Sequence, residues 1–257
     1  MPKQIITTKA ESTLELKAIS ISNRKGGIGK TILTTVIAEE LANADYSVVM
    51  LDLDLQTDLT DINLSQKDDS KFFDLLTGRK TIDEVIVELP DKDDKKIIPG
   101  SANVDKIKNV VSNSLAEIVE ELKLTHDFVL LDHPPSITEI SEADYIASEG
   151  LLIVAEAQQL SLKNLVSFLI EVEIIKKTEA TELEVLGIVA NKVDLRRNIT
   201  ERMLEKYRIT YPELFFENYI GVDTAIPNVQ LGQQNIRDLG WRAKTLSQFE
   251  RVIEEML

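Results

Sequence analysis

Residues 19–35 read ISISNRKGGIGKTILTT, the most informative stretch of the chain. An apolar strand runs into a glycine-rich turn that opens directly into a helix, which is the setting of a phosphate-binding loop. The usual pattern, G-x-x-x-x-G-K-[ST], requires a glycine five residues before Gly29. The chain has Arg24 at that position, followed by Lys25. The loop therefore lacks the first glycine and gains a lysine inside the turn.

The rest of the loop predicts a nucleotide site. Amides of the loop and of the helix start would face the phosphates, Lys30 would meet the β and γ oxygens, and the Thr31 hydroxyl would ligate Mg²⁺. The expected nucleotide contacts in this stretch are Gly26, Gly27, Ile28, Gly29, Lys30, Thr31 and Ile32. A plain glycine turn is the weaker interpretation, because strand, motif and helix coincide.

Apolar runs of strand length recur along the chain, separated by segments of helical length and period. The strands are expected at 16–22, 46–52, 95–100, 127–132, 150–157, 185–191 and 215–220, and the helices at 31–43, 104–124, 160–178 and 200–207. Continuous apolar strands that alternate with helices predict an α/β fold with a mostly parallel, twisted sheet and helices on both faces. We expect one domain over 16–257, preceded by a tail or an added edge strand over 1–15.

Carboxylates follow two of the expected strands. Asp52, Asp54 and Asp58 stand in LDLDLQTDLT, and Asp132 follows a run of apolar residues in DFVLLD. Beside a phosphate loop, one carboxylate can hold Mg²⁺ through water and another can orient an attacking water. Loop and carboxylates together predict a nucleotide hydrolase site.

Composition excludes several classes of protein. The chain has 257 residues, of which 43% are hydrophobic and 28% charged, which is a globular profile. It has no cysteine, so chemistry that needs a thiolate, a disulfide or a cysteine-ligated metal is excluded. No leader-like segment and no apolar run long enough for a membrane span is found, so we expect a cytoplasmic protein without membrane attachment.

The charge distribution limits where nucleic acid could bind. The net charge is −15, which repels phosphate backbones on average. Residues 191–257 hold ten basic and ten acidic side chains, so the whole excess of acid lies before them. Any nucleic-acid surface should therefore lie in the last quarter of the chain.

Four motifs together resemble the ParA/Soj/MinD group of deviant-Walker ATPases, and most closely the short partition ATPases of the ParA type. They are KGGIGKT (25–31), DLDLQTDLT (52–60), DFVLLDHPPS (127–136) and IPNVQL (226–231). The resemblance runs from about residue 19 to the C-terminus. It implies a P-loop ATPase that uses ATP and Mg²⁺ and works as a homodimer.

The resemblance also implies a role for each matching residue. Lys25 would reach across a dimer interface to the phosphates in the partner subunit, so that two ATP molecules lie between two chains. Such a contact forms only when ATP is bound and the dimer is assembled, so it couples nucleotide state to assembly. Together with Lys30 and Asp54, Lys25 would form the catalytic set.

The other implied roles concern the attacking water, the metal ion and the adenine of the nucleotide. The metal site would consist of Thr31, Asp54 and Asp132. Thr31 would ligate Mg²⁺ directly, Asp132 would hold it through water, and Asp54 would also position the attacking water. Asp52 would support the same site. Asn191 and Pro227 match positions that hold the adenine.

Some residues depart from the family pattern. The family usually reads D-x-D-P-Q-x-N, whereas this chain has Leu55 for the proline and Asp58 for the asparagine. In addition, residues 191–194 read NKVD, which matches the guanine-reading N-K-x-D of GTPases, whose aspartate accepts from the N–H groups of guanine. A GTP-dependent switch therefore stays open beside ATP.

Partition ATPases of this type bind non-specific double-stranded DNA as ATP-bound dimers, through basic residues on the C-terminal side. The expected DNA contacts here are Arg196, Arg197, Arg202 and Lys206. The alternative is that these are surface charges paired with Glu201 and Glu205. A further basic position of the family is Gln230 in this chain.

The C-terminal segment distinguishes two branches of the group. MinD ends in an amphipathic basic helix that binds membranes. Here the apolar face would consist of Leu246, Phe249, Val252, Ile253 and Met256. The polar face is mainly acidic, the wrong sign for anionic lipid, so we expect this helix to pack on the core.

The expected function is an ATP-driven DNA-segregation switch. A centromere-binding, ParB-like partner would stimulate slow hydrolysis in a nucleoid-associated dimer. The alternative from another class is a ParA-like ATPase that positions a protein cargo without binding DNA.

Overall fold

The computed structural model describes most of the chain. The described residues are 16–64, 71–89, 94–103, 111–135, 139–157, 159–179, 183–223 and 243–257. The expected tail or edge strand over 1–15 lies outside them.

Within these residues, eight strands form one sheet in the order β3-β4-β2-β5-β1-β6-β7-β8. The strands are β1 Ala18–Ser22, β2 Val48–Asp52, β3 Val87–Glu88, β4 Lys95–Ile98, β5 Phe128–Asp132, β6 Gly150–Glu156, β7 Glu184–Val193 and β8 Phe215–Gly221. All neighbours pair in parallel except β3 and β4, which are antiparallel. The seven expected strands and the mostly parallel sheet are confirmed. The two-residue β3 was not expected.

The helices lie in the connections between parallel strands, except α10, which follows the last strand β8. They are α1 Lys30–Asn43, α2 Asp58–Asn63, α3 Lys71–Leu76, α4 Ile82–Val85, α5 Val111–Lys123, α6 Glu139–Ala147, α7 Gln159–Thr178, α8 Asn198–Thr210 and α10 Ala243–Met256. The four helices expected between strands appear as α1, α5, α7 and α8. For the helix expected over 104–124, residues 104–110 lie outside the described part.

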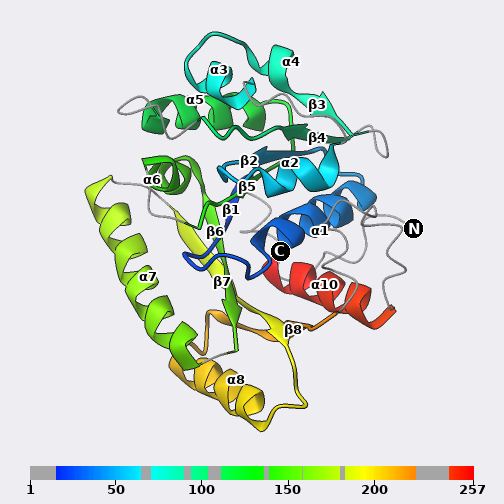
Figure 1. Cartoon of the computed structure of the whole chain (residues 1–257), viewed down its shortest axis with the longest axis vertical. Coiled ribbons are helices and arrows are strands. Elements are labelled where there is room, and N and C mark those ends of the chain that lie inside the picture. Colours follow the sequence, from blue (N-terminus) through cyan, green and yellow to red (C-terminus); the bar gives the residue numbers. More distant parts are fainter. Residues whose placement is uncertain are drawn as a thin grey trace.

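The sheet separates two layers of helices (Figure 1). One buried cluster joins α1 and α10 to one face, with Ile19 and Ile21 of β1 among its members. Ala18 of the same strand points to the opposite face and packs with α3, α5 and α6. A third cluster joins α7 and α8 to β6 and β7 on that side. Because the central strands are covered on both faces, most of their side chains are apolar in both directions, with Ser20 and Ser22 of β1 as buried polar exceptions.

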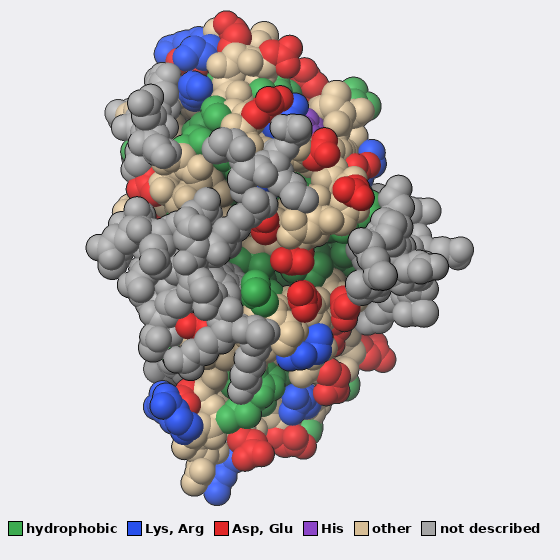
Figure 2. All heavy atoms as spheres, turned by 90° about the vertical axis from the view of Figure 1, so that its right-hand side faces the viewer, with side chains coloured by type: hydrophobic (Ala, Val, Ile, Leu, Met, Phe, Trp, Pro, Cys, Tyr) green, Lys and Arg blue, Asp and Glu red, His purple; other side chains and the backbone are tan. Residues whose placement is uncertain are grey.

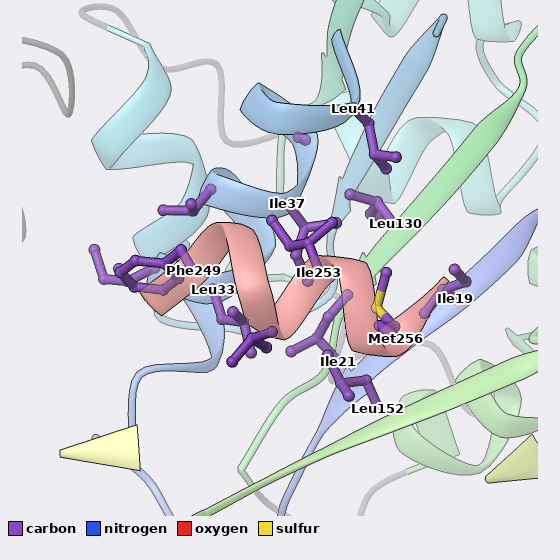
Figure 3. Packing of buried hydrophobic residues seen from close by; sticks show 14 of the residues in the cluster. Ile19, Ile21, Leu33, Ile37, Leu41, Leu130, Leu152, Phe249, Ile253 and Met256 are labelled. Atoms are coloured by element: carbon purple, nitrogen blue, oxygen red, sulfur yellow. The ribbon is translucent and has the colours of Figure 1, made fainter. Parts of the chain in front are cut away.

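The C-terminal helix α10 packs on the core beside α1 (Figure 3). Phe249, Ile253 and Met256 are at most 6% exposed. Leu246 differs from the expectation, because its side chain is 39% exposed and lies at the edge of this face. Among the described residues, no helix is long and apolar enough to cross a membrane.

Truncation of Phe249 should test this packing. Phe249 is 1% exposed, so Phe249→Ala should lower the free energy of unfolding by about 3–5 kcal/mol, through lost burial and the cavity left behind. Leu246→Ala on the same helix should cost less than about 1 kcal/mol, because that side chain is partly in water. Urea unfolding of both variants measures the difference. Equal losses would contradict the packing of α10.

Candidate nucleotide and magnesium site

The phosphate loop connects β1 to α1 and has a backbone that favours glycine at two positions. Gly27 has φ +70° and Gly29 has φ +94°, both in the left-handed region. Helix α1 begins at Lys30, and no described side chain caps its N-terminus. The first amides of α1 are therefore available to an anion, and the helix dipole favours negative charge there.

The end of β7 holds this loop in place. The Asn191 side chain donates from Nδ2 to the carbonyl of Ile28 at 2.7 Å, and Lys192 Nζ donates to the carbonyl of Gly27. A Cβ on Gly29 would lie 2.3 Å from Asn191 Nδ2, so this approach requires glycine. From the sequence, Asn191 is expected at the adenine, and Lys192 has no expected role. The motif NKVD, residues 191–194, contains both residues and is the sequence feature that could have pointed to this contact with the loop.

Lys30 and Asp132 lie buried at the foot of the loop. Lys30 is 6% exposed, and burial lowers its pKa, while the charges of Asp132, Asp54 and Asp58 oppose that shift. Asp132 ends β5 and is 1% exposed, and its pKa is raised by burial and then by the charge of Asp52. Asp132 Oδ2 has no hydrogen-bond partner within the described residues. A buried, unpartnered carboxylate oxygen beside a buried lysine is suited to a further cationic or water ligand.

Asp52 shapes the loop that carries Asp54. It pairs with Asp132 in the register of β2 and β5. Asp52 Oδ2 accepts from the Thr60 amide at 2.8 Å and from its hydroxyl at 2.6 Å, and Oδ1 accepts from the Asp54 amide at 3.2 Å. Asp54 is half-buried, and its Oδ1 accepts from the Gln56 amide at 3.0 Å. Hydrogen bonds from backbone amides to these carboxylates thus hold the turn of the loop, at a place where the family pattern has a proline and this chain does not.

The residues at this site fit a Mg²⁺ ion that takes most of its ligands from the bound nucleotide and from water. Within the described part, no group of three His, Cys, Asp or Glu side chains could hold a metal ion by itself. Mg²⁺ in phosphate sites usually keeps several waters and takes few protein ligands. The Thr31 hydroxyl at the helix start and the unpartnered oxygen of Asp132 match that donor set.

Two cations of the loop are paired within the same chain. Lys25 Nζ forms an ion pair with Glu156 at the end of β6, and Arg24 forms one with Glu171 on α7. The Lys25 side chain is 43% exposed, whereas that of Glu156 is 10% exposed. Lys25 therefore lies at the surface of the site, unlike the buried Lys30.

A buried polar network under the site was not expected from the sequence. His133 Nδ1 lies 2.5 Å from Asp144 Oδ2, and His133 Nε2 lies 2.8 Å from the Tyr145 hydroxyl. That hydroxyl lies 2.9 Å from Ser22 Oγ, at the end of β1. Burial lowers the pKa of His133. The network links the residue after Asp132 to the strand that enters the phosphate loop.

The expected DNA contacts differ in their surroundings. Arg196 is paired with Asp194, with Nε–Oδ1 at 2.7 Å and Nη2–Oδ2 at 2.9 Å. Arg197, Arg202 and Lys206 are exposed. In the described ranges, neither Arg202 nor Lys206 forms an ion pair with Glu201 or Glu205, the pairing that the alternative interpretation required. The structure places these side chains in the turn after β7 and on α8.

Two expected positions lie outside the described residues. They are Pro227, at the adenine, and Gln230, in the second basic position of the family. Their roles stay predictions.

Parallel strand order, a glycine loop that opens α1 and a buried aspartate at the end of β5 define a nucleotide-binding α/β protein of the P-loop class. A family model described as an AAA domain matches residues 16–185. The chain belongs to the ParA family of ATPases within this class.

Relatives in sequence agree with this assignment. An uncharacterized protein of Methanocaldococcus jannaschii is 28% identical over 76% of this chain and 81% of its own length. The sporulation initiation inhibitor protein Soj of Bacillus subtilis is 24% identical over 84% of this chain and 87% of its own length.

Solved structures show the same fold. Apo McdA of Cyanothece superposes with a TM-score of 0.82 at 21% identity, covering 94% of this chain and 99% of that chain. A plasmid partition protein of Borrelia burgdorferi bound to AMPPNP gives 0.77 at 18% identity, covering 93% and 98%. Cobyrinic acid a,c-diamide synthase of Mycobacterium smegmatis with ADP and magnesium gives 0.74 at 18% identity, covering 93% and 92%.

The buried Asp52 predicts a pH dependence of stability. Burial raises its pKa to about 7, against hydrogen bonds from Thr60 that lower it. The folded state therefore holds a proton on Asp52 that the unfolded state releases near pH 4, so the contribution of this carboxyl group to stability is most favourable at low pH and is lost as the pH rises from about 4 to 7.

Asp52→Asn should reduce this fall and raise the free energy of unfolding at pH 8 by about 2–4 kcal/mol in EDTA. Urea titrations from pH 5 to 8 measure it, with the exposed Asp83→Asn as the matched control. A variant with the same pH slope as the unmodified protein would refute the assignment.

Proposed function

We propose that the protein is an ATP-dependent DNA-segregation ATPase. Two ATP-bound chains form a dimer that binds non-specific DNA, and a centromere-binding, ParB-like partner stimulates slow hydrolysis that releases monomers. The proposed place of action is the nucleoid in the cytoplasm. Membership of the ParA family supports the ATPase, and the finer steps rest on residues of this chain.

One observation carries the proposal: the phosphate loop has two lysines in different environments. Lys30 is buried at the start of α1. In this position it would bind the nucleotide of its own chain. Lys25 is exposed and pairs with Glu156, so it is not needed to complete that site from within. The phosphates of ATP in a partner subunit would compete with Glu156 for this lysine. Assembly would then depend on ATP, because only a triphosphate supplies enough negative charge at that place.

The proposed hydrolysis needs little beyond positioning and charge. Loop amides and Lys30 bind and orient the phosphates. Lys25 of the partner subunit places a positive charge beside the phosphate oxygens, where it stabilises the negative charge of the transition state. Asp54, held in its turn by the Gln56 amide, orients the water. Mg²⁺, when bound through the Thr31 hydroxyl and near Asp132, would neutralise phosphate charge. Because the site has no strong general base among these residues, turnover is expected to be slow. Slow hydrolysis would then set how long the ATP-bound dimer persists.

The proposed DNA surface consists of Arg197, Arg202 and Lys206, with Arg196 beside them. The first three are exposed and lie on α8 or at its start. On the face seen in Figure 2, acidic side chains are spread over the described surface and the basic ones form no continuous patch. A dimer would double the number of phosphate contacts, which is why binding should require ATP.

The second candidate is an ATPase that positions a protein cargo by the same nucleotide cycle. The net charge of −15 favours it, and so does the neutralisation of Arg196 by Asp194. Both reduce the attraction to DNA.

Removal of the Lys25 charge tests the shared dimer. Lys25→Ala should bind ATP but stay monomeric, and its turnover should fall by about 10²-fold, since a charge that acts on the transition state is lost. Sedimentation with ATP and Mg²⁺ measures the mass, and Lys177→Ala on α7 removes an equivalent exposed charge as the control. An ATP-dependent dimer of unchanged stability in Lys25→Ala would contradict the proposal.

DNA retention with ATP, ADP or no nucleotide separates the two candidates. The unmodified protein should be retained only with ATP, and Arg197→Ala/Arg202→Ala should lower the salt slope of log K by about 2 per chain. Lys176→Ala/Lys177→Ala removes the same charge from α7 and should keep the slope. Lack of retention, where ATP demonstrably drives dimerisation, would favour protein cargo.

A further inference from the structure

The motif NKVD, residues 191–194, divides into two parts in the structure. Its first two side chains hold the phosphate loop, because Asn191 donates to the carbonyl of Ile28 at 2.7 Å and Lys192 donates to the carbonyl of Gly27. The oxygen of the Asn191 side chain accepts from the Lys192 amide at 2.8 Å. The amide of Asn191 is thus engaged at both its nitrogen and its oxygen. The remaining side chain of the motif with the chemistry to read a base edge is that of Asp194.

The carboxylate of Asp194 is already occupied. Arg196 donates from Nε to Oδ1 at 2.7 Å and from Nη2 to Oδ2 at 2.9 Å, and its backbone amide donates to Oδ1 at 3.2 Å. Two parallel N–H groups of a guanidinium therefore meet both oxygens of the carboxylate. The Watson–Crick edge of guanine offers the same pair of parallel donors, N1–H and N2–H. The edge of adenine offers an acceptor at N1 and a donor at N6, which does not match a carboxylate.

We propose that Arg196 determines the purine specificity of the site by occupying Asp194 in the place of guanine. This inference rests on the proposed nucleotide function. GTP could use Asp194 only after displacing two charge-assisted hydrogen bonds, whereas ATP needs no such exchange. Neutralisation of Asp194 also removes repulsion between its carboxylate and the N1 lone pair of adenine. The arrangement explains a guanine-reading motif in a member of an ATPase family.

The expected size of the effect follows from exposure. The Arg196 side chain is 86% exposed and that of Asp194 is 23% exposed, so solvent and salt weaken the pair. Its removal should therefore change GTP affinity by about fivefold to tenfold and not by several orders of magnitude. The exposure of Arg196 also means that its truncation leaves the core intact.

The test compares the dissociation constants of non-hydrolysable ATP and GTP analogues with Mg²⁺. Arg196→Ala should bind the GTP analogue about fivefold to tenfold more tightly, with binding of the ATP analogue unchanged or weaker. Arg196→Ala/Asp194→Asn should lose this gain, because Asp194 supplies it. Arg208→Ala removes an arginine that contacts Glu217 on the neighbouring strand and is the control for loss of positive charge.

The outcomes separate this inference from the proposed function. An unchanged ratio of ATP to GTP affinity in Arg196→Ala overturns the inference, and so does a gain that persists in the double variant or appears equally in Arg208→Ala. Equal affinity for both nucleotides in the unmodified protein overturns it too, while the nucleotide switch stands. Failure of the unmodified protein to bind either nucleotide overturns the proposed function itself.

Discussion

The amides at the start of α1 can bind an anion only if no side chain of the protein caps them. Contacts on both sides of the phosphate loop hold it in the shape that leaves these amides open. On one side, Asn23 donates to the carbonyl of Val154 on β6 at 2.6 Å and accepts from the Lys25 amide at 3.0 Å. On the other, Asn191 and Lys192 bind loop carbonyls from the end of β7. The loop depends on β1, β6 and β7 being consecutive in the sheet, so its shape is a property of the topology.

The same topology brings two carboxyl groups together beneath the loop. β2 and β5 are neighbours, and their ends bring Asp52 beside Asp132, both almost fully buried. Burial of two carboxylates is costly, which is why both pKa values are raised. Asp52 offsets part of the cost through Thr60, and the hydroxyl of Thr60 also accepts from the Gly100 amide at 2.8 Å. Stability is thus traded for a site suited to cations, as functional sites often require.

Much of the fold was readable because its signals are periodic and local. Seven strands and four crossover helices followed from apolar runs and helical spacing. The elements that were not expected are β3 with two residues, α4 with four, α2 and α3 with six each, and α6 with nine. All of these helices are shorter than the four crossover helices that periodicity predicted. The burial of Lys95 could not be inferred from the sequence, for another reason. It stands in a charge run, DKDDKK, yet it is 3% exposed and lies 2.5 Å from Glu39 on α1. Its burial depends on where β4 docks, which charge patterning does not reveal.

The phosphate loop, its two lysines and the carboxylates at the strand ends could be identified from the sequence alone, because glycine conformations, helix starts and strand ends are set by neighbouring residues. The pairing of these groups depends on the folded structure. Lys25 meets Glu156 across 131 residues, and Asn191 meets Ile28 across 163. Asp194 and Arg196 are close in sequence, but the position of their turn beside the phosphate loop depends on the contacts that Asn191 and Lys192 make with loop carbonyls. A charge's partner is set by which strands become neighbours, and that order emerges only when the whole sheet has formed.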